Sequence, residues 1–245
     1  MTVPVADPWA ALRAATPARI GLGRSGDAQP LAAVLAFQLA HARARDAVVA
    51  ALDTDAIAAA LPDRTTLHVR SRASGRDVYL RRPDLGRRLD PACVGMLAPG
   101  GWDAVFVIAD GLSAGAVQRH AVPVLRATLA RLAGWRIGPV VIATQARVAL
   151  GDEIGAALGA GMVVMLIGER PGLSVADSLG IYLTAHPRVG RRDAERNCLS
   201  NIHPAGGFGY DEAAGQLARL MHAARRRGLS GVASGDAMTL TDARA

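Results

Sequence analysis

Residues 158–172 read L-G-A-G-M-V-V-M-L-I-G-E-R-P-G, and they hold the pattern that decides the fold. The six apolar residues from Met162 to Ile167, with glycine on both sides, are typical of a strand buried on both faces, as in a parallel sheet covered by helices. Glu169 and Arg170 follow where that strand would leave the sheet. Ligands of open α/β sheets bind just outside the carboxyl ends of strands. The segment is therefore a candidate ligand-binding loop, and an ordinary turn with a surface Glu-Arg pair fits it equally well.

The same kind of pattern recurs on both sides of this strand. Apolar segments predict further strands at 103–109, 139–144 and 197–202, and residues 175–186 begin as a turn or helix and end as a strand. Helical periodicity predicts helices at 116–133, 151–158 and 211–227. Strands that alternate with helices indicate an α/β fold, and we predict a Rossmann-like, mainly parallel sheet with helices on both faces.

The first ninety residues have a different pattern. A short helix with Asp7 as its N-cap is expected first, then helices at 31–51 and 54–61, and a half-exposed strand at 64–72. The polar, arginine-rich segment 79–89 comes before the regular alternation begins. We therefore expect two domains. Residues 1–90 would form a smaller helical N-terminal domain with an arginine-rich connection, and residues 91–245 the Rossmann-like domain.

Composition narrows the class of protein. The chain has 245 residues and a net charge of +7, and all 28 basic residues are arginine. This charge suits phosphate or an acidic partner surface. The densest basic run, 225–227, has no aromatic neighbour on which a base could stack, so we expect no nucleic-acid partner. Cys93 and Cys198 give neither a disulfide framework nor zinc spacing. With no secretory signal and no apolar run of bilayer length, we expect a cytoplasmic protein with no membrane association.

Two glycine motifs resemble known functional motifs, but the sequence around each motif argues against the functional interpretation. Residues 21–26, G-L-G-R-S-G, match a dinucleotide fingerprint, but no strand precedes them, so a glycine-rich linker or a partner-binding loop is favoured. Residues 111–115, G-L-S-A-G, lie between a predicted strand and a predicted helix, as a nucleophile elbow does. Ser113 would then be the nucleophile of a stand-alone α/β hydrolase. A plain turn between strand and helix is the alternative, and it is favoured because no oxyanion-hole motif lies upstream.

His203 raises a third reading. Residues 201–206, N-I-H-P-A-G, differ by one residue from the D-x-H-x-x-G pattern of corrinoid-carrying modules, in which the histidine is the lower cobalt ligand. Asn201 stands where that pattern has an aspartate, and a ligating histidine usually needs such a partner. A polar loop residue is therefore the favoured interpretation of His203, and we expect no metal ligand from this chain.

Several longer stretches carry a closer resemblance. They are 16–26 (T-P-A-R-I-G-L-G-R-S-G), 37–46 (F-Q-L-A-H-A-R-A-R-D), 79–88 (Y-L-R-R-P-D-L-G-R-R), 108–113 (I-A-D-G-L-S), 165–173 (M-L-I-G-E-R-P-G-L) and 198–203 (C-L-S-N-I-H). In these stretches the chain resembles the small, or light, subunit of ethanolamine ammonia-lyase. The stretches keep the family's order over almost the whole chain.

The resemblance implies an adenosylcobalamin-dependent carbon–nitrogen lyase that converts ethanolamine to acetaldehyde and ammonia by a radical mechanism. It implies a hetero-oligomer in which the large subunit, a TIM barrel, holds the substrate. The small subunit would bind the cofactor at the subunit interface through Val148, Glu169 and Cys198, with no catalytic residue of its own. The cofactor's own dimethylbenzimidazole would be the lower cobalt ligand. A cytoplasmic location is favoured, and packaging in a bacterial microcompartment stays open.

Overall fold

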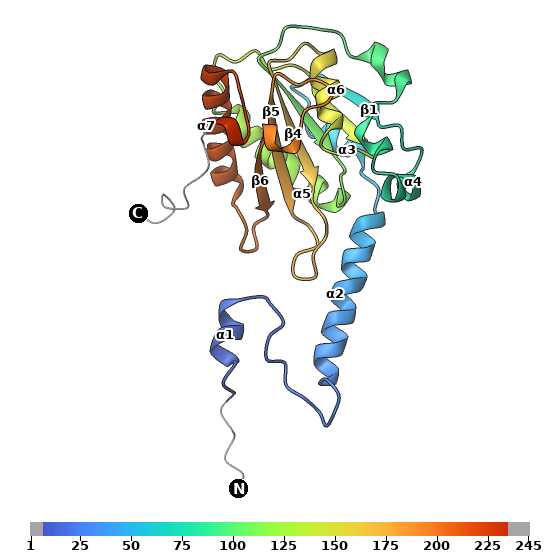
Figure 1. Ribbon diagram of the computed structural model, residues 1–245, viewed down its shortest axis with the longest axis vertical. Coiled ribbons are helices and arrows are strands. Elements are labelled where there is room, and N and C mark those ends of the chain that lie inside the picture. The colour runs from blue at the N-terminus through green and yellow to red at the C-terminus, as the bar shows by residue number, and fades with distance from the viewer. Residues whose placement is uncertain (1–6, 235–245) are drawn as a thin grey trace.

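The computed structural model describes residues 7–234 (Figure 1). Its strands are β1 (Thr66–Arg70), β2 (Ala104–Ala109), β3 (Val140–Thr144), β4 (Met162–Gly168), β5 (Leu179–Ala185) and β6 (Arg196–Ile202). Its α-helices are α1 (Ala10–Ala15), α2 (Leu31–Val49), α3 (Thr54–Ala59), α4 (Arg76–Arg81), α5 (Ala114–Leu129), α6 (Leu150–Ala157) and α7 (Tyr210–Arg227). Short 3-10 turns lie at Leu85–Arg87, Pro91–Met96, Asp193–Glu195 and Val232–Ser234.

The strands form one six-stranded sheet in the order β1-β3-β2-β4-β5-β6. β1, β3, β2 and β4 are parallel to one another, and β5 is antiparallel to both of its neighbours. All strands except β5 therefore point the same way. This confirms the predicted mixed α/β class with a mostly parallel sheet.

Both faces of the sheet are covered, which explains the continuous apolar runs in the sequence. Every residue of β2 and β4 is buried. Side chains of α5 and α7 pack on one face, where Phe106 and Leu125 belong to the core. Side chains of α6 pack on the other face, where Ile154 and Met165 lie in a second core. Each such side chain contributes roughly 1.5–3 kcal/mol when it is fully buried.

Local signals place the ends of several helices. The Asp53 carboxylate accepts the Ala56 N–H at 2.9 Å, as expected for the cap of α3. Ser113 caps α5 in the same way, with its hydroxyl 3.4 Å from the Ala116 nitrogen. α7 has Asp211 and Glu212 in its first turn and arginines in its last, and this arrangement favours the helix dipole. It ends at Gly228, whose φ of 71° is left-handed.

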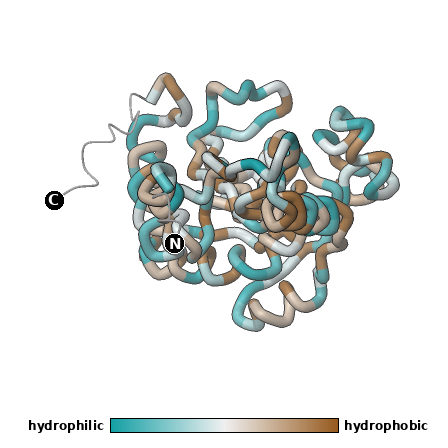
Figure 2. Tube along the Cα trace, turned by 90° about the horizontal axis from the view of Figure 1, so that it is seen from below, coloured by the Kyte–Doolittle hydropathy of each residue, from teal (hydrophilic) through white to brown (hydrophobic). Residues whose placement is uncertain are grey.

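Residues 7–50, here called the N-terminal arm, extend away from the sheet (Figure 1). None of the 19 residues of α2 is buried. At the turn of the arm, Gly21 has a φ of 53° and lies against the ring of Trp9, where a Cβ would clash. Near the start of the arm, Arg19 donates to the carbonyl of Leu173, in the loop between β4 and β5, at 3.1 Å. Figure 2 shows the hydropathy of the trace from the arm's end of the molecule.

The structure corrects two expected details of the N-terminal half. The first helix begins at Ala10 with Trp9 at its N-cap, and Asp7 instead accepts the Trp9 N–H at 3.0 Å. The half-exposed strand, β1, pairs with β3 at the edge of the main sheet. The expected boundary at residue 90 therefore falls after the first strand of the sheet. The division into two domains and the Rossmann-like label stay predictions.

Candidate functional site

A cavity of about 400 Å³ lies at the carboxyl edge of the sheet. Its lining is drawn from α4, from β5 and β6, from the end of β4, and from the segments that follow β2, β3 and β4. The lining residues are Tyr79, Gly111, Leu112, Arg147, Val148, Ile167, Gly168, Glu169, Arg170, Tyr182 and Ser200. This volume is within the range of small-molecule sites.

The strand order explains why the cavity forms there. After β2 the chain crosses one face as α5 and enters β3 on one side of β2. After β3 it crosses the opposite face as α6 and enters β4 on the other side of β2. The connections therefore diverge between the carboxyl ends of β2 and β4. Such a switch point is where open α/β sheets bind their ligands.

Main chain forms the floor of the cavity. The Leu112 N–H donates to the Gly168 carbonyl at 2.9 Å, which joins the ends of β2 and β4. A Cβ on Gly111, whose φ is 55°, would lie 2.2 Å from the Gly168 oxygen. A Cβ on Gly168 would lie 2.2 Å from the Ser113 oxygen. Only glycine permits this approach, so the two glycines hold the two loops together.

Glu169 is held in place by three donors. Its Oε2 accepts the Ser178 hydroxyl at 2.7 Å and the Asn201 N–H at 3.1 Å. Its Oε1 accepts the Ser200 hydroxyl. The side chain lies against Gly180 of β5, where a Cβ would be 3.0 Å from Oε1. A carboxylate has about four acceptor positions, so one remains for a ligand.

A buried tyrosine supports the opposite wall. Tyr79 is fully buried, and its hydroxyl donates to the Ala146 carbonyl at 3.1 Å. The guanidinium carbons of Arg147 and Arg76 lie 4.2 and 4.8 Å from its ring centroid. Burial raises the pKa of Tyr79 to about 12, so the phenol is neutral at physiological pH. The ring therefore acts as a platform for the Arg147 side chain.

Arg76 links this wall to the N-terminal arm. Its Nε donates to the Val48 carbonyl at the end of α2, at 2.6 Å. Its Nη1 donates to the Gly111 carbonyl in the cavity floor at 2.8 Å. The same atom lies 3.5 Å from the buried Asp110 carboxylate. One guanidinium thus touches both the arm and the cavity.

The structure brings together two of the three expected cofactor residues. Val148, half-buried in the turn between β3 and α6, and Glu169, which follows β4, both line the cavity. Cys198 is exposed on β6 and does not line the cavity. Its partner across the strands is Tyr182 of β5, which does line the cavity. The role of each as a cofactor contact stays a prediction.

Sequence reasoning missed most of the other walls. Tyr79, Arg147 and Tyr182 were not singled out as site residues, although Tyr79 begins one of the stretches that carry the resemblance. The stretch 108–113, which contains Gly111 and Leu112, held a usable signal, because it follows a buried strand and ends in a helix cap.

Ser113 has no role as a nucleophile in this structure. The residue is fully buried, caps α5, and donates its hydroxyl to the Ala176 carbonyl at 3.1 Å. The nearest histidine on that helix, His120, contacts the Tyr210 hydroxyl at 2.8 Å and the Asp177 carbonyl at 3.0 Å. The arrangement is that of a turn between strand and helix, so the hydrolase reading lacks its nucleophile–base pair.

His203 is likewise enclosed. It is 4% exposed, and its Nε2 lies 2.9 Å from the Asn201 side-chain oxygen. Gly207 packs so closely that a Cβ would lie 2.6 Å from the ring. The imidazole therefore faces protein rather than a ligand site. Among residues 7–234, no cluster of three or more His, Cys, Asp or Glu side chains is arranged to hold a metal ion.

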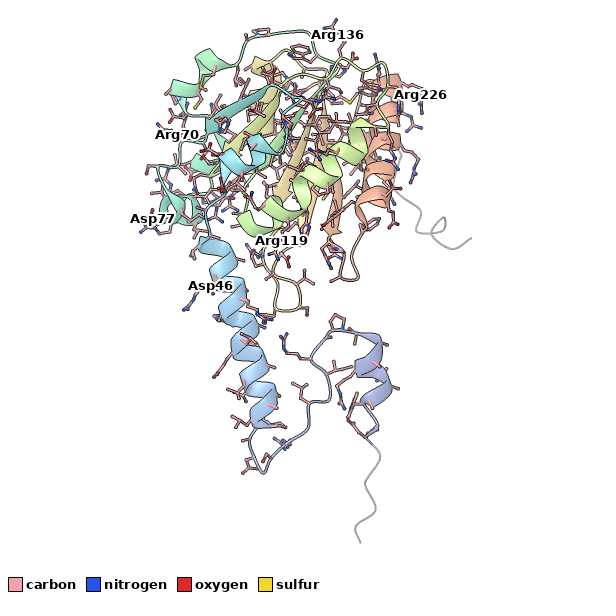
Figure 3. The ribbon with its side chains drawn as sticks, turned by 180° about the vertical axis from the view of Figure 1, so that it is seen from behind. Asp46, Arg70, Asp77, Arg119, Arg136 and Arg226 are labelled. Atoms are coloured by element: carbon pink, nitrogen blue, oxygen red, sulfur yellow. The ribbon has the colours of Figure 1, made fainter. Side chains whose placement is uncertain are left out.

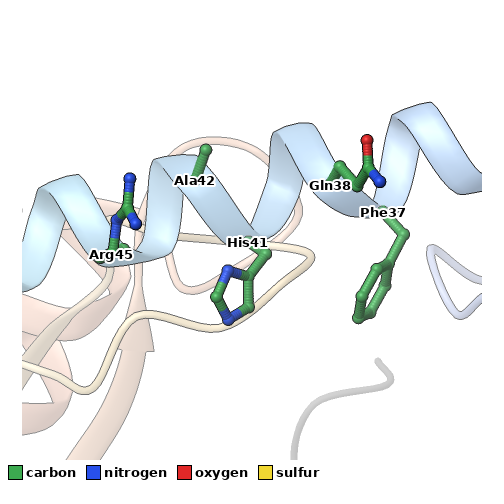
Figure 4. Close-up of a pocket in the computed structure, with 5 residues that line it drawn as sticks. All are labelled: Phe37, Gln38, His41, Ala42 and Arg45. Atoms are coloured by element: carbon green, nitrogen blue, oxygen red, sulfur yellow. The ribbon is translucent and has the colours of Figure 1, made fainter.

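A second hollow, of about 350 Å³, lies along α2 (Figure 4). Figure 4 shows Phe37 and His41 pointing to the same side of the helix. Their ring centroids are 6.5 Å apart. Arg45 lies one turn further along that side. One helix alone lines it, so it is an exposed helix surface rather than an enclosed site.

In the described part of the chain, no helix is both long and apolar enough to span a bilayer.

Comparison with known proteins assigns the chain to a family. The family model for the ethanolamine ammonia-lyase light chain (EutC) matches residues 6–234. The chain is 54% identical over 236 residues to the ethanolamine ammonia-lyase small subunit of Azotobacter vinelandii. The aligned region covers 92% of this chain and 87% of that protein. It is 57% identical over 233 residues to the small subunit of Rhodopseudomonas palustris, with coverage of 92% and 88%. Identity to the small subunit of Xanthomonas campestris is 52% over 241 residues, with coverage of 94% and 88%.

The matched range takes in the cavity, its glycine floor and the N-terminal arm together. The chain belongs to the family of ethanolamine ammonia-lyase light chains, the small subunits of that enzyme.

Proposed function

We propose that this chain binds adenosylcobalamin at an interface with the large subunit, in a complex that converts ethanolamine to acetaldehyde and ammonia. The observation that carries the proposal is the cavity at the switch point, which brings Val148 and Glu169 to one edge of the sheet. When bound, the cofactor supplies a cobalt–carbon bond whose homolysis starts radical chemistry. This chain's residues bind and orient the cofactor, and the large subunit holds the substrate.

The residues that line the cavity suit the periphery of a corrin. The free acceptor position of Glu169 suits an amide N–H of a corrin side chain. Val148 offers an apolar contact to a flat macrocycle. Arg147 has a buried Nε with no hydrogen-bond partner among the described residues, which suits an acceptor on the ligand. Cys198 lies on β6 opposite Tyr182 of β5, which lines the cavity, and it offers a small, polarisable contact at the edge of the cavity.

The size of the cavity supports a shared site. A cavity of about 400 Å³ is smaller than a corrin with its nucleotide and adenosyl groups, so this chain covers only part of the cofactor. A second protein surface must cover the rest if water is to be excluded from a radical reaction. A partner subunit fulfils this need, and membership of a small-subunit family implies one.

The N-terminal arm supports the same assembly. α2 carries apolar residues on every side, and Leu31, Leu35 and Leu39 are 71%, 54% and 52% exposed. Large apolar side chains that gather on an exposed surface mark an interaction site. We propose that the large subunit covers α2. The arm would then form the smaller helical part of the chain, ahead of a Rossmann-like part that contributes to the cofactor site.

The test is to reconstitute the enzyme. The purified chain, incubated with adenosylcobalamin and ethanolamine, is expected to show no turnover, because no acid–base–nucleophile set lines its cavity. Addition of the large subunit is expected to restore lyase activity and cofactor binding together. In a parallel experiment, the variant Leu35→Glu, which places a charge on exposed α2 without touching the core, should assemble less well with the large subunit. Turnover by this chain alone, or full assembly of the Leu35→Glu chain, would contradict the proposal. Fractionation of native cells would show whether the complex is cytoplasmic or packaged in a microcompartment.

A further inference from the structure

The cavity has a positive wall whose charge no residue in the described part of the chain neutralises. Arg147 and Arg170 both line it, and neither forms an ion pair within residues 7–234. Arg170 is exposed at the rim, where no hydrogen bond from the described residues engages it. The one carboxylate among the lining residues, Glu169, already accepts from Ser178, Ser200 and Asn201. The two guanidiniums are therefore available to an anion.

Arg147 is held in a fixed position. Its guanidinium lies over the Tyr79 ring at 4.2 Å, and its backbone N–H donates to the Gly86 carbonyl at 2.8 Å. A Cβ on Gly86 would lie 2.9 Å from Cγ of Arg147, so glycine makes room for the side chain against the ring. Its Nη2 reaches the Tyr79 carbonyl only at 3.4 Å. Stacking orders the side chain while most of its N–H groups remain unused.

The buried Nε of Arg147 indicates which kind of ligand group would bind there. This N–H has no hydrogen-bond partner in the structure. A buried donor without a partner costs about as much as a lost hydrogen bond, so a native site rarely keeps one without a purpose. A guanidinium presents Nε and a terminal nitrogen as a planar fork that matches two oxygens of a phosphate.

We propose that Arg147, assisted by Arg170, binds the phosphodiester of the cofactor's nucleotide loop and thereby selects the complete cofactor over one that lacks the loop. This inference rests on the proposed function. The corrin side chains are neutral amides, and the phosphodiester is the one group on the cofactor's periphery with a full negative charge. Glu169, with a carboxylate, would face the amides, and Arg147, across the floor formed by Gly111 and Gly168, would face the phosphate. The two walls thus recognise chemically different parts of one ligand.

The experiment compares two ligands in the assembled two-subunit enzyme. Dissociation constants for hydroxocobalamin and for cobinamide, which lacks the phosphate and base, are measured by equilibrium dialysis at low salt. Arg147→Met keeps an apolar stem against Tyr79 and removes the fork. It is expected to weaken hydroxocobalamin binding by about tenfold to a hundredfold, the range for a charge-assisted hydrogen bond, and to leave cobinamide binding unchanged. Raising the salt concentration should weaken hydroxocobalamin binding in the wild type more than in the variant.

Two further variants keep the test decisive. Arg170→Met changes an exposed side chain with no described partner, so it carries little risk to folding, and it should show the same selective loss at smaller size. Arg226→Met removes one positive charge from α7, which Figure 3 shows on the far side of the sheet from Asp77 in α4, and should change neither constant. Equal weakening for both ligands, or no weakening for hydroxocobalamin, would overturn the phosphate assignment and leave the cofactor site standing. Failure of the wild-type complex to bind either ligand would overturn the proposed function itself.

Discussion

Arg196 and Asp152 form a bidentate ion pair in the interior, with nitrogen–oxygen distances of 2.6 and 2.7 Å. Both side chains are 2% exposed. Burial raises the pKa of the Asp152 carboxyl, and the guanidinium of Arg196 acts against that shift. Since Arg196 begins β6 and Asp152 lies in α6, the pair fixes the last strand to the helix that follows β3.

Removal of one partner should therefore be far worse than removal of both. Asp152→Ala leaves the buried guanidinium with only the exposed Asp193 carboxylate, 3.5 Å from its Nε, as counter-charge, and we expect the free energy of unfolding to fall by about 3–5 kcal/mol. The double variant Asp152→Leu with Arg196→Met should recover much of that loss. Urea denaturation measures both. Asp84→Ala, which breaks the exposed pair with Arg82, is the control and should change stability little. A double variant as unstable as Asp152→Ala would contradict this account.

Glu169→Leu should weaken cobalamin binding to the assembled enzyme. The substitution removes the acceptor that we propose for a corrin amide, at a cost of about 1–3 kcal/mol, or roughly tenfold to a hundredfold in the dissociation constant. Glu169→Gln keeps one carbonyl acceptor and should be milder. The loss of acceptors for Ser178 and Asn201 also affects the free protein, so melting temperatures are needed beside the binding data. An unchanged dissociation constant for Glu169→Leu would show that this loop does not touch the cofactor.

Ser113→Ala should leave the lyase activity of the complex within a small factor. The hydroxyl caps α5 and donates to Ala176, so its loss should cost about 0.5–2 kcal/mol of stability without changing the chemistry. The wild-type chain should also be inert toward fluorophosphonate probes, because this hydroxyl is buried. Stoichiometric labelling at Ser113, detected by peptide mass spectrometry, would revive the hydrolase reading.

The cofactor should bind with its own dimethylbenzimidazole on cobalt. Asn201 occupies the position of the orienting aspartate, and His203 is buried against Gly207, so this chain offers no imidazole there. In electron paramagnetic resonance of the cob(II)alamin complex, the three-line ¹⁴N splitting should persist when the protein alone is labelled with ¹⁵N. It should also survive His203→Ala. A change to the two-line ¹⁵N pattern would identify a protein ligand and favour the corrinoid-carrying reading.

The sequence predicted those features that depend on local patterns. β4 was predicted from six apolar residues between glycines, because the whole signal lies within the strand and its immediate neighbours. The strand-end rule also predicted Glu169 at the carboxyl edge of the sheet, where it lines the cavity. The antiparallel direction of β5 was not predicted, since a short apolar run does not show which way the chain crosses the sheet.

The remaining walls of the cavity depend on contacts between distant segments. Tyr79 reaches Ala146 across 67 positions, and Arg76 reaches Gly111 across 35. The arginine-rich segment 79–89 was interpreted as a connection because it is polar and the regular alternation of strands and helices begins only after it. Only the fold shows that Arg147 stacks on Tyr79 and that Cys198 lies on the same strand as the lining residue Ser200 without lining the cavity itself. A pairing of this kind has no signature within either segment.

The main-chain floor of the cavity has a consequence for redesign. Gly111 and Gly168 exclude any side chain, so substitution at the floor breaks the contact between two strand ends instead of reshaping the site. The side walls are different, because Arg147, Tyr182 and Ser200 present groups that are exchangeable one at a time. Directed evolution toward altered corrinoids should therefore accumulate its mutations on the walls, while libraries that randomise the two glycines yield mostly misfolded protein.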